Sequence, residues 1–378
     1  MSLSWLVGLS AALHFYIGLR LVPSLPGGWA FALVLLLAVS ALSTPLGLIA
    51  RRLARAPLAD KLAWAGLVFM GLFSSLFVLT LLRDAALLAA WVIDAVAPGA
   101  LPVAALRSFS GMGVPPLALA VTAFGYFNAR RTAAVVAVDV PIRGLPAALQ
   151  GFTIAQISDI HVGPTIKGPY LDGIVDAVNA LQPDLVAITG DLVDGTVAEL
   201  APHVAPLARL QSRHGSFFVT GNHEYYSGAG PWLAELERLG ITNLLNQHVV
   251  IERGGALLVL AGVPDYSAGH FDRSHRSDPA AAMAGAPGGA AAKVLLAHQP
   301  RTAQAAAQAG FDLQLSGHTH GGQFLPWNFF VRFQQPFTAG LHRLGAMWVY
   351  VSRGTGYWGP PKRFWAPSEI TKIRLVSA

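Results

Sequence analysis

Three uninterrupted apolar runs occupy most of the first 82 positions of this 378-residue chain. They cover residues 3–22, 28–50 and 62–82, and each is long enough to cross a hydrocarbon core of about 30 Å as a helix. A fourth apolar run, residues 109–127, carries two consecutive prolines. One such run could be a buried core helix. Three or four in series predict a membrane domain of about four helices, whose backbone groups are satisfied within each segment.

The first run has neither a basic start nor a small-residue cleavage site. We therefore expect a retained anchor rather than a removable signal peptide. A shorter apolar stretch, residues 85–97, contains Asp94 and is expected to lie at the membrane interface or to re-enter the membrane without crossing it.

Basic residues predict the orientation of the spans. Residues 51–61 contain four Lys or Arg, and the fourth run ends at Arg130-Arg131. Four spans place both basic segments on one side, which the positive-inside rule makes cytoplasmic. We expect a multi-pass protein of the cell (inner) membrane with a cytoplasmic C-terminal domain. If residues 85–97 also crossed the membrane, there would be five spans and the orientation would be reversed.

Charge and histidine are distributed unevenly along the chain. Residues 1–131 hold nine Lys or Arg against three Asp or Glu, whereas residues 132–378 hold 17 of each. The C-terminal part therefore indicates no nucleic-acid partner. Eleven of the twelve histidines lie in this part. The absence of cysteine excludes disulfides, zinc–thiolate sites and cysteine nucleophiles.

From about residue 133, short apolar strands alternate with amphipathic helices, which is typical of an α/β domain. We divide the chain into a transmembrane helical domain, residues 1–131, and an α/β domain, residues 132–378. The stretch 280–292, rich in Ala, Gly and Pro, is expected to be a surface loop. Helices are expected at 170–181, 197–210 and 231–239, and strands at 152–157, 185–188, 217–219, 249–251, 257–260, 294–296, 311–315, 348–351 and 370–375.

Polar clusters follow five of these strands. Divalent cations favour their mixture of carboxylate, amide oxygen and imidazole. Seven such groups exceed what one ion needs, whereas two ions sharing a bridging carboxylate would use them all. Two cations about 3.5–4 Å apart form a clamp for in-line displacement at phosphorus. The clusters are Asp159-Ile160-His161, Gly190-Asp191, Gly221-Asn222-His223-Glu224, His298 and Gly317-His318-Thr319-His320.

Together the five clusters resemble the signature of calcineurin-like metallophosphoesterases, over roughly residues 150–378. The resemblance implies a four-layer α/β/β/α sandwich with two divalent metal ions, for which Mn, Fe or Zn would serve and Mn is favoured. Asp191 would bridge the two metals. The remaining ligands would be Asp159, His161 and His320 for one metal, and Asn222, His298 and His318 for the other.

Two further roles are implied by the resemblance. His223 would protonate the leaving oxygen, and Asp194 would orient the His223 imidazole, although Asp194 could instead cap the following turn. The segment 352–361 is similar to the bacterial, membrane-anchored branch of the family. Some members of that branch cleave a lipid-linked sugar nucleotide, but motifs shared by the whole family do not carry that substrate over to this chain.

Aromatic residues are frequent in the stretch that follows His320. They either form a cap packed on the sheet, or an apolar lip that admits an acyl chain or touches the membrane, with Arg332 and Arg343 meeting headgroup phosphates. The residues concerned are Phe324, Trp327, Phe329, Phe330, Phe333 and Phe337. Histidines outside the motifs, and Asp265, are expected in packing, surface or turn roles.

The sequence therefore predicts a membrane-anchored di-metal phosphoesterase. It would hydrolyse a phosphodiester or pyrophosphate bond by attack of a metal-bridging hydroxide, with membrane lipids as partners and a lipid-linked substrate among the candidates. One alternative is a phosphoesterase of a soluble nucleotide or second messenger. The other is a non-catalytic, phosphate-binding membrane scaffold, against which the presence of His223 argues, because a binder needs no general acid.

Overall fold

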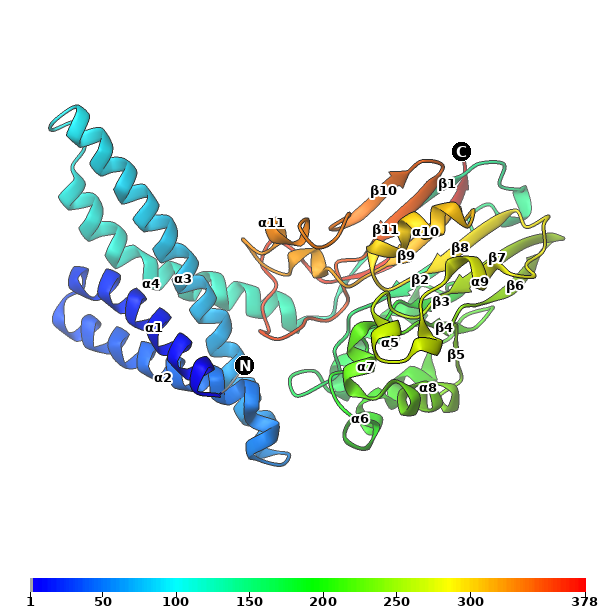
Figure 1. Ribbon diagram of the computed structural model, residues 1–378, viewed down its shortest axis with the longest axis horizontal. Coiled ribbons are helices and arrows are strands. Elements are labelled where there is room, and N and C mark those ends of the chain that lie inside the picture. The colour runs from blue at the N-terminus through cyan, green and yellow to red at the C-terminus, as the bar shows by residue number, and fades with distance from the viewer. Residues whose placement is uncertain (1–2) are drawn as a thin grey trace. The chain divides into compact units, whose positions relative to one another are not determined.

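The computed structural model describes residues 3–378 (Figure 1). Its contacts divide the chain into two units. The first contains Met1–Phe127 and Gly359–Lys362, and the second contains Asn128–Trp358 and Arg363–Ala378. We call them the helical unit and the phosphoesterase-like unit.

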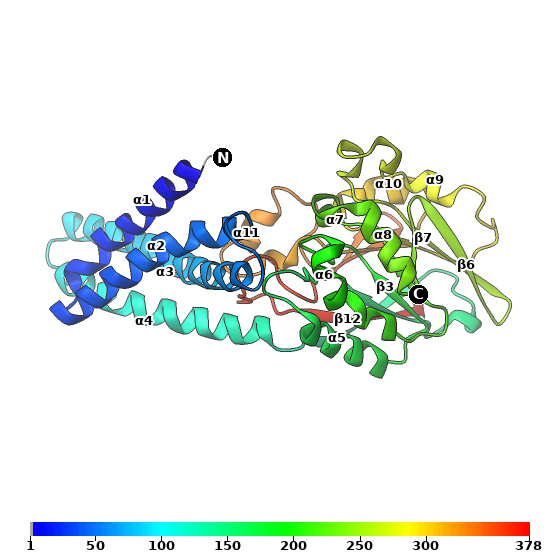
Figure 2. The same cartoon turned by 90° about the horizontal axis from the view of Figure 1, so that it is seen from below.

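Four long helices form most of the helical unit, and Figure 2 shows them from below. They are α1 (Leu3–Leu21), α2 (Gly27–Leu53), α3 (Leu58–Val96) and α4 (Val103–Arg130). All four are long and apolar enough to cross a membrane, as the apolar runs predicted. Their outward faces are largely apolar, whereas the small core between α1, α2, α3 and α4 contains Ile17, Leu21, Leu33, Leu37, Leu72, Leu76, Val114 and Ala118.

The expectation for residues 85–97 is wrong. These residues form no separate interfacial segment, because α3 continues without a break to Val96. The charged pair Arg83-Asp84 does not interrupt the helix, since neighbouring helices satisfy it. Asp84 pairs with Arg20 at 2.8 Å, and Arg83 Nε donates to Ser110 Oγ at 3.0 Å. With 39 residues α3 is about 58 Å long, and four helices of the described residues are long and apolar enough to cross a membrane.

Helices α2 and α3 touch through their backbones. Gly47 and Gly66 face each other so closely that a Cβ on Gly66 would lie 2.5 Å from both the Gly47 Cα and the Ser43 carbonyl oxygen. Small residues at a membrane-helix contact permit such an approach.

Two six-stranded sheets form the centre of the phosphoesterase-like unit. The first has the order β1-β12-β2-β3-β4-β5 and the second β10-β11-β9-β8-β7-β6. The first consists of β1 (Ala134–Ile142), β2 (Thr153–Ile157), β3 (Leu185–Ile188), β4 (Ser216–Phe218), β5 (Ile241–Asn243) and β12 (Glu369–Ser377). The second consists of β6 (Gln247–Arg253), β7 (Ala256–Gly262), β8 (Ala292–Leu296), β9 (Leu313–Ser316), β10 (Gly340–Leu344) and β11 (Met347–Val351).

Three separate apolar clusters show that the unit has four layers. One lies between the first sheet and the helices α5 (Gly168–Ala180), α6 (Val197–Val204) and α8 (Ala229–Arg238). The second lies between the two sheets. The third joins the second sheet to α9 (Pro279–Met283) and α10 (Ala303–Gln308). The α/β/β/α sandwich is confirmed.

Every strand expected from the sequence is present, but the sequence missed β1, β5 and β10. β5 has only three residues, and β1 and β10 are the outermost strands of their sheets. The prediction of a loop at residues 280–292 is wrong at both ends. Its first residues belong to α9, where the Asp278 side chain accepts from two backbone N–H groups and so caps the helix. Its last residue, Ala292, begins β8.

Strand direction brings the polar loops together. β2, β3 and β4 run parallel in the first sheet, and β7, β8, β9 and β11 run parallel in the second. Carboxyl ends of parallel strands share one edge, where α/β sheets bind ligands. The loops after β2, β3, β4, β8 and β9 carry all five predicted clusters.

Candidate metal centre

The predicted ligands converge in two groups of three. Ligand atoms of Asp159, His161 and His320 lie within 4.8 Å of one another, and so do those of a second group, which consists of Asp191, His298 and His318. The imidazoles approach closely within each group: His161 Nε2 is 3.1 Å from His320 Nε2, and His298 Nε2 is 3.2 Å from His318 Nδ1.

Asp191 lies between the two groups. Its Oδ2 is 3.1 Å from His298 Nε2 and 3.9 Å from His161 Nε2. Its Oδ1 accepts the backbone N–H of His223 at 2.9 Å. One carboxylate therefore faces both groups, as a bridging ligand must.

Asn222 supplies the clearest sign that a cation fits here. Its side chain is buried, and its Oδ1 has no hydrogen-bond partner among the described residues. A buried carbonyl oxygen left without a partner is unfavourable by about 1–3 kcal/mol. A divalent cation beside the second group would satisfy it, since amide oxygen, carboxylate and imidazole are all ligands for such ions.

Five of the seven predicted ligands have a left-handed backbone, which is uncommon outside glycine. Their φ angles lie between 51° and 70°. Such strain persists only where the surrounding structure enforces it, and it concentrates at functional sites. Here it turns consecutive loop residues toward the centre. The five are Asp159, His161, Asp191, His318 and His320.

Two glycines make the close packing of these loops possible. A Cβ on Gly221 would collide with Asp191 Oδ1, and a Cβ on Gly317 would collide with Asp159 Oδ2 and Ser158 Oγ. Each glycine therefore leaves the space that a metal-facing carboxylate occupies.

His223 stands beside the two groups and is held by Asp194. Its Nδ1 is 2.6 Å from Asp194 Oδ1, and the same oxygen is 3.0 Å from His161 Nδ1. Burial alone would lower the pKa of His223, but the hydrogen bond to Asp194 and the charges of Asp191 and Asp194 outweigh it and raise the pKa to about 9.

Neighbouring charges set the protonation of the centre. Although burial opposes ionisation, nearby imidazoles, first that of His298, hold the pKa of Asp191 well below its ordinary value. Burial, and then the charge of His298, lower the pKa of His318 to about 3. Burial and the Arg363 guanidinium lower the pKa of His320 well below its ordinary value. Anionic carboxylates with neutral imidazoles are the forms that bind metal.

Two pKa shifts have the opposite sense. Burial, and the negative charge of Asp191, raise the pKa of Asp159. Asp191 also outweighs the effect of burial on His298 and raises its pKa well above the ordinary value. Both shifts reflect negative charge gathered in a buried site, and a cation would compensate that charge.

Glu224 ends the third polar cluster, and its role is visible only in the fold. This fully buried carboxylate accepts the backbone N–H groups of Gly221 at 2.6 Å, Leu192 at 2.8 Å and Asp191 at 3.0 Å. Glu224 thus joins the loop that carries Asp191 to the loop that carries Asn222.

Arg363 was missed altogether. Its buried guanidinium donates to the carbonyl oxygen of His320 at 2.9 Å and lies 3.0 Å from His320 Nδ1. His320 therefore presents its Nε2, not its Nδ1, to the other ligands.

Residues outside the motifs behave as expected. Asp265 Oδ1 accepts from the backbone N–H of Ser267 at 2.8 Å, which is a turn role. His275 Nδ1 is 2.9 Å from the Tyr225 hydroxyl. In the aromatic stretch, Phe324 is buried and Phe337 packs in the third apolar cluster, as a cap on the sheet would, whereas the other four side chains are exposed. A contact of those four with an acyl chain or the membrane stays a prediction.

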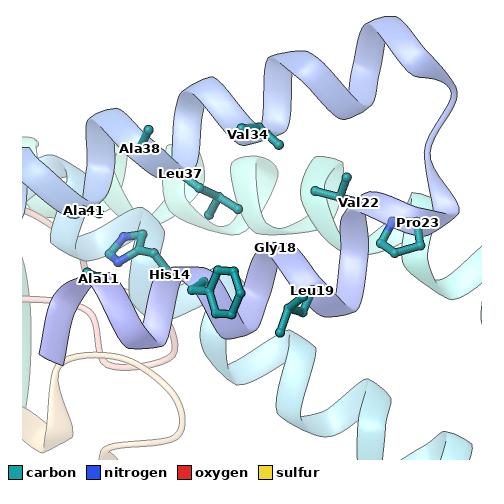
Figure 3. Close-up of a pocket in the computed structure, with 11 residues that line it drawn as sticks. Ala11, His14, Gly18, Leu19, Val22, Pro23, Val34, Leu37, Ala38 and Ala41 are labelled. Carbon is teal, nitrogen blue, oxygen red and sulfur yellow. The ribbon is translucent and has the colours of Figure 1, made fainter. Parts of the chain in front are cut away.

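Two cavities in the helical unit are of a different kind. Figure 3 shows one of about 460 Å³ between α1 and α2, in which His14 is the only lining residue with a polar side chain. His14 is already hydrogen-bonded, with Nδ1 2.7 Å from the Ser10 carbonyl oxygen and Nε2 2.8 Å from Ser40 Oγ. The other, of about 490 Å³, is lined by apolar residues of α2, α4 and the turn before α2. Neither offers a set of metal ligands.

Comparison with known proteins agrees with the geometry of the centre. A family model described as calcineurin-like phosphoesterase matches residues 152–322. A metallophosphoesterase of Aquifex aeolicus, itself uncharacterized, is 31% identical over a region that covers 59% of this chain and 84% of that protein. The chain belongs to the calcineurin-like phosphoesterase family.

Other similar members also extend beyond the motif region. A bovine protein described as a transmembrane protein with metallophosphoesterase domain is 41% identical over 280 residues, which cover 70% of this chain and 63% of the relative. An uncharacterized metallophosphoesterase of Campylobacter jejuni is 38% identical over 66% of this chain and 64% of the relative. The chain thus spans slightly under two thirds of these two relatives, and the similarity is not confined to bacteria.

Proposed function

We propose that this family member is a membrane-anchored, metal-dependent hydrolase of a phosphodiester or pyrophosphate bond. The observation that carries the proposal is the position of Asp191. This buried carboxylate faces two ligand groups at once, and the His223–Asp194 pair lies beside it.

In this proposal Asp191 bridges two divalent cations, Mn being the first choice. Bound there, the cations would activate water and neutralise charge on the phosphoryl oxygens. The unpartnered Asn222 Oδ1 supports an oxygen ligand on one side of the bridge. The ligands would be Asp159, His161 and His320 for one cation, and Asn222, His298 and His318 for the other.

His223 would donate the proton to the leaving oxygen. Its Nδ1 faces Asp194, so its Nε2 is the nitrogen that can reach the substrate. That Nε2 is 4.0 Å from Asp191 Oδ2, so it would face a phosphoester bound at the two ligand groups. Its raised pKa of about 9 supports a protonated acid at neutral pH.

We further propose that the substrate is presented at the cytoplasmic surface of the cell's inner membrane, with a lipid-linked phosphoester as the first candidate. The four apolar helices support membrane attachment. The basic loop between α2 and α3 and the basic end of α4 support the cytoplasmic side. A soluble nucleotide or second messenger is the alternative substrate for the same centre.

The test measures hydrolysis of bis-p-nitrophenyl phosphate by the full chain in detergent with Mn²⁺, Fe²⁺ or Zn²⁺. We expect Asp191→Ala to abolish activity and to lower the metal content of the purified protein. His223→Ala should keep the metal but reduce kcat by about 10²–10⁴-fold. His270→Ala, an exposed histidine outside the centre, is the matched control.

A wild-type protein that binds these metals but hydrolyses neither this diester nor a panel of lipid and nucleotide diesters and pyrophosphates would contradict the proposal. That result would favour the phosphate-binding scaffold instead.

A further inference from the structure

Exposed aromatic side chains of the phosphoesterase-like unit are confined to one edge. Eleven large hydrophobic side chains of this unit are exposed, and nine of them are aromatic. All nine lie in the loops after β4, β7, β9 and β11. These strands end at the edge of the sheets that carries the metal centre. We call the nine residues the aromatic edge.

The loop after β9 contributes four of them. Phe329 and Phe330 belong to the short helix α11 (Asn328–Val331), with Trp327 before it and Phe333 after it. Phe333 is 75% exposed. The exposed Arg332 lies 5.4 Å from the Phe333 ring centroid and adds a positive charge to the group.

The loop after β11 contributes Trp358 and Trp365, which are 55% and 77% exposed. Both are tied to the metal loop, because the Gln323 side-chain Nε2 donates to the Trp358 carbonyl oxygen at 2.9 Å and Phe324 forms a β-bridge with Trp365. Between the two tryptophans, the segment Gly359–Lys362 belongs to the helical unit.

The remaining three aromatic residues are Tyr226, Tyr266 and Phe271, of which Tyr226 contacts the candidate general acid. Tyr226 and Trp358 stand on two sides of His223, with ring centroids 5.3 and 5.7 Å from that of the imidazole. Phe271 in turn contacts Tyr226 at 5.6 Å, and Tyr266 lies in the same loop as Phe271. Exposed aromatic side chains therefore lie next to the candidate general acid.

We propose that the aromatic edge inserts into the headgroup region of the bilayer that holds the protein's own helices. Trp and Tyr favour the membrane–water interface, where one part of the ring is apolar and the other hydrated. Arg332 would meet the lipid phosphates. Clustered exposed apolar residues mark interaction surfaces, and this cluster surrounds the very site at which we propose that a phosphoester is cleaved.

Short chain segments join the phosphoesterase-like unit to the helical unit. α4 ends at Arg130 and β1 begins at Ala134, so three residues, or about 10 Å of extended chain, separate a membrane helix from the first strand. The segment Gly359–Lys362 makes a second connection, since Lys362 Nζ donates to Ser75 Oγ at 2.6 Å and to the Gly71 carbonyl at 3.1 Å in α3.

The chain has no cysteine, so single-cysteine variants can report the depth of the edge directly. Phe333→Cys and Trp365→Cys would carry a nitroxide label in the full chain, with one chain in each phosphatidylethanolamine–phosphatidylglycerol nanodisc. Val250→Cys is the control, because Val250 is an exposed apolar residue in β6, away from the aromatic edge. The measurement compares two collision rates of the label. One is the rate with O₂, which concentrates in lipid, and the other is the rate with a water-soluble nickel chelate.

We expect the O₂-to-nickel accessibility ratio to be several-fold higher at positions 333 and 365 than at position 250. Equal ratios at all three positions would overturn the proposal. If positions 333 and 365 became shielded only when two chains share a disc, with broadening between labels, the edge would be an interface between copies, and the bilayer assignment would be wrong.

The consequence for substrate use rests on the proposed function and is tested separately. The double variant Phe330→Ser/Phe333→Ser should hydrolyse bis-p-nitrophenyl phosphate as the wild type does but lose about tenfold in rate on a phosphodiester lipid embedded in vesicles. Equal losses on both substrates would argue against a docking role. If the wild type hydrolysed nothing, the proposed function would fail, whereas the label measurement would still decide whether the edge docks.

Discussion

At the scale of single residues, Glu224 has the most specific positioning role. Its two carboxylate oxygens accept three backbone N–H groups from the loops that carry Asp191 and Asn222. In Glu224→Gln, one of the oxygens becomes an NH₂ group that faces donors instead of accepting from them. Because residues that orient metal ligands typically account for a 10–100-fold effect on affinity, we expect a loss of metal affinity of about that size, measured by calorimetric titration with Mn²⁺.

The control for this variant is Glu199→Gln. Glu199 also accepts a backbone N–H, that of Thr196, but in the capping box at the start of α6. It should leave Mn²⁺ affinity unchanged. Equal affinities in the Glu224 variant and the wild type would show that the two loops keep their positions without this carboxylate.

Gly221 allows a second prediction at this scale. Because its missing Cβ leaves room for Asp191 Oδ1, Gly221→Ala must displace either the bridging carboxylate or the Asn222 loop. A misplacement of about 1 Å can reduce a rate about 10²-fold, so we expect a loss of this size in kcat/KM for a chromogenic diester.

Gly230→Ala provides the comparison for Gly221→Ala. A Cβ at Gly230 in α8 would meet nothing within 4 Å, so this variant should retain full activity and gain about 0.5–1 kcal/mol in stability. Full activity in both alanine variants would contradict the close-packing explanation.

The ligand residues could be predicted from sequence because each is a chemically distinctive side chain at the end of an apolar strand. The role of Glu224 could not, since its partners are backbone N–H groups, which look the same at every position. Arg363 lies 43 residues after His320 and sits in a loop without strand periodicity. Only the folded chain brings that loop back to the centre.

At the scale of elements, long apolar periodic segments were predictable and short edge segments were not. α3 was divided wrongly at Arg83-Asp84, because in isolation a charged pair marks the end of a membrane span. The partners that remove this penalty, Arg20 on α1 and Ser110 on α4, are distant in sequence. Strands β1 and β10 pair on one side only, and the sequence carries a weak signal for such strands.

The crossing of α2 and α3 gives a prediction for the helical unit. Since the Gly47 and Gly66 backbones already touch, Gly66→Val must push the helices apart. Overpacking of this kind typically destabilises by about 1–3 kcal/mol. We expect a lower midpoint of thermal unfolding in detergent, followed by circular dichroism at a helical wavelength. Gly113→Ala in α4, where a Cβ would meet nothing within 4 Å, should not lower the midpoint.

The buried amine of Lys362, in the segment Gly359–Lys362, leads us to expect that the stability of the protein depends on pH. Burial lowers the pKa of Lys362 to about 8, whereas an unfolded lysine has a pKa of about 10.4. Between these values the unfolded state binds more protons, so stability rises with pH across this window and is lost as pH falls back to 8. The unfolding midpoint of wild type should therefore increase from pH 8 to pH 10 relative to Lys362→Met. Parallel pH profiles of the two proteins would contradict a buried, uncharged lysine.

At the scale of the whole molecule, the proposed orientation in the membrane rests on the number of spans and on the positions of the basic residues. The structure provides four helices that are long and apolar enough to cross a membrane, with α3 as a single helix, and the proposed side rests on the positions of the basic residues. In the proposed four-span topology, the α2–α3 loop and the phosphoesterase-like unit would share one side, and the α3–α4 loop would lie on the other. We propose from the positive-inside rule that the first side is the cytoplasm.

Cysteine labelling in intact bacterial cells tests this assignment. Ala100→Cys lies in the α3–α4 loop and Ala56→Cys in the α2–α3 loop, and both positions are exposed. We expect a membrane-impermeant maleimide to label residue 100 in intact cells, but residue 56 and Val250→Cys only after permeabilisation. The reverse pattern would place the metal centre outside the cytoplasm. Labelling of residues 56 and 250 from opposite sides would instead contradict the four-span topology. In that topology two spans, α3 and α4, separate residue 56 from residue 250, so both residues lie on the same side of the membrane.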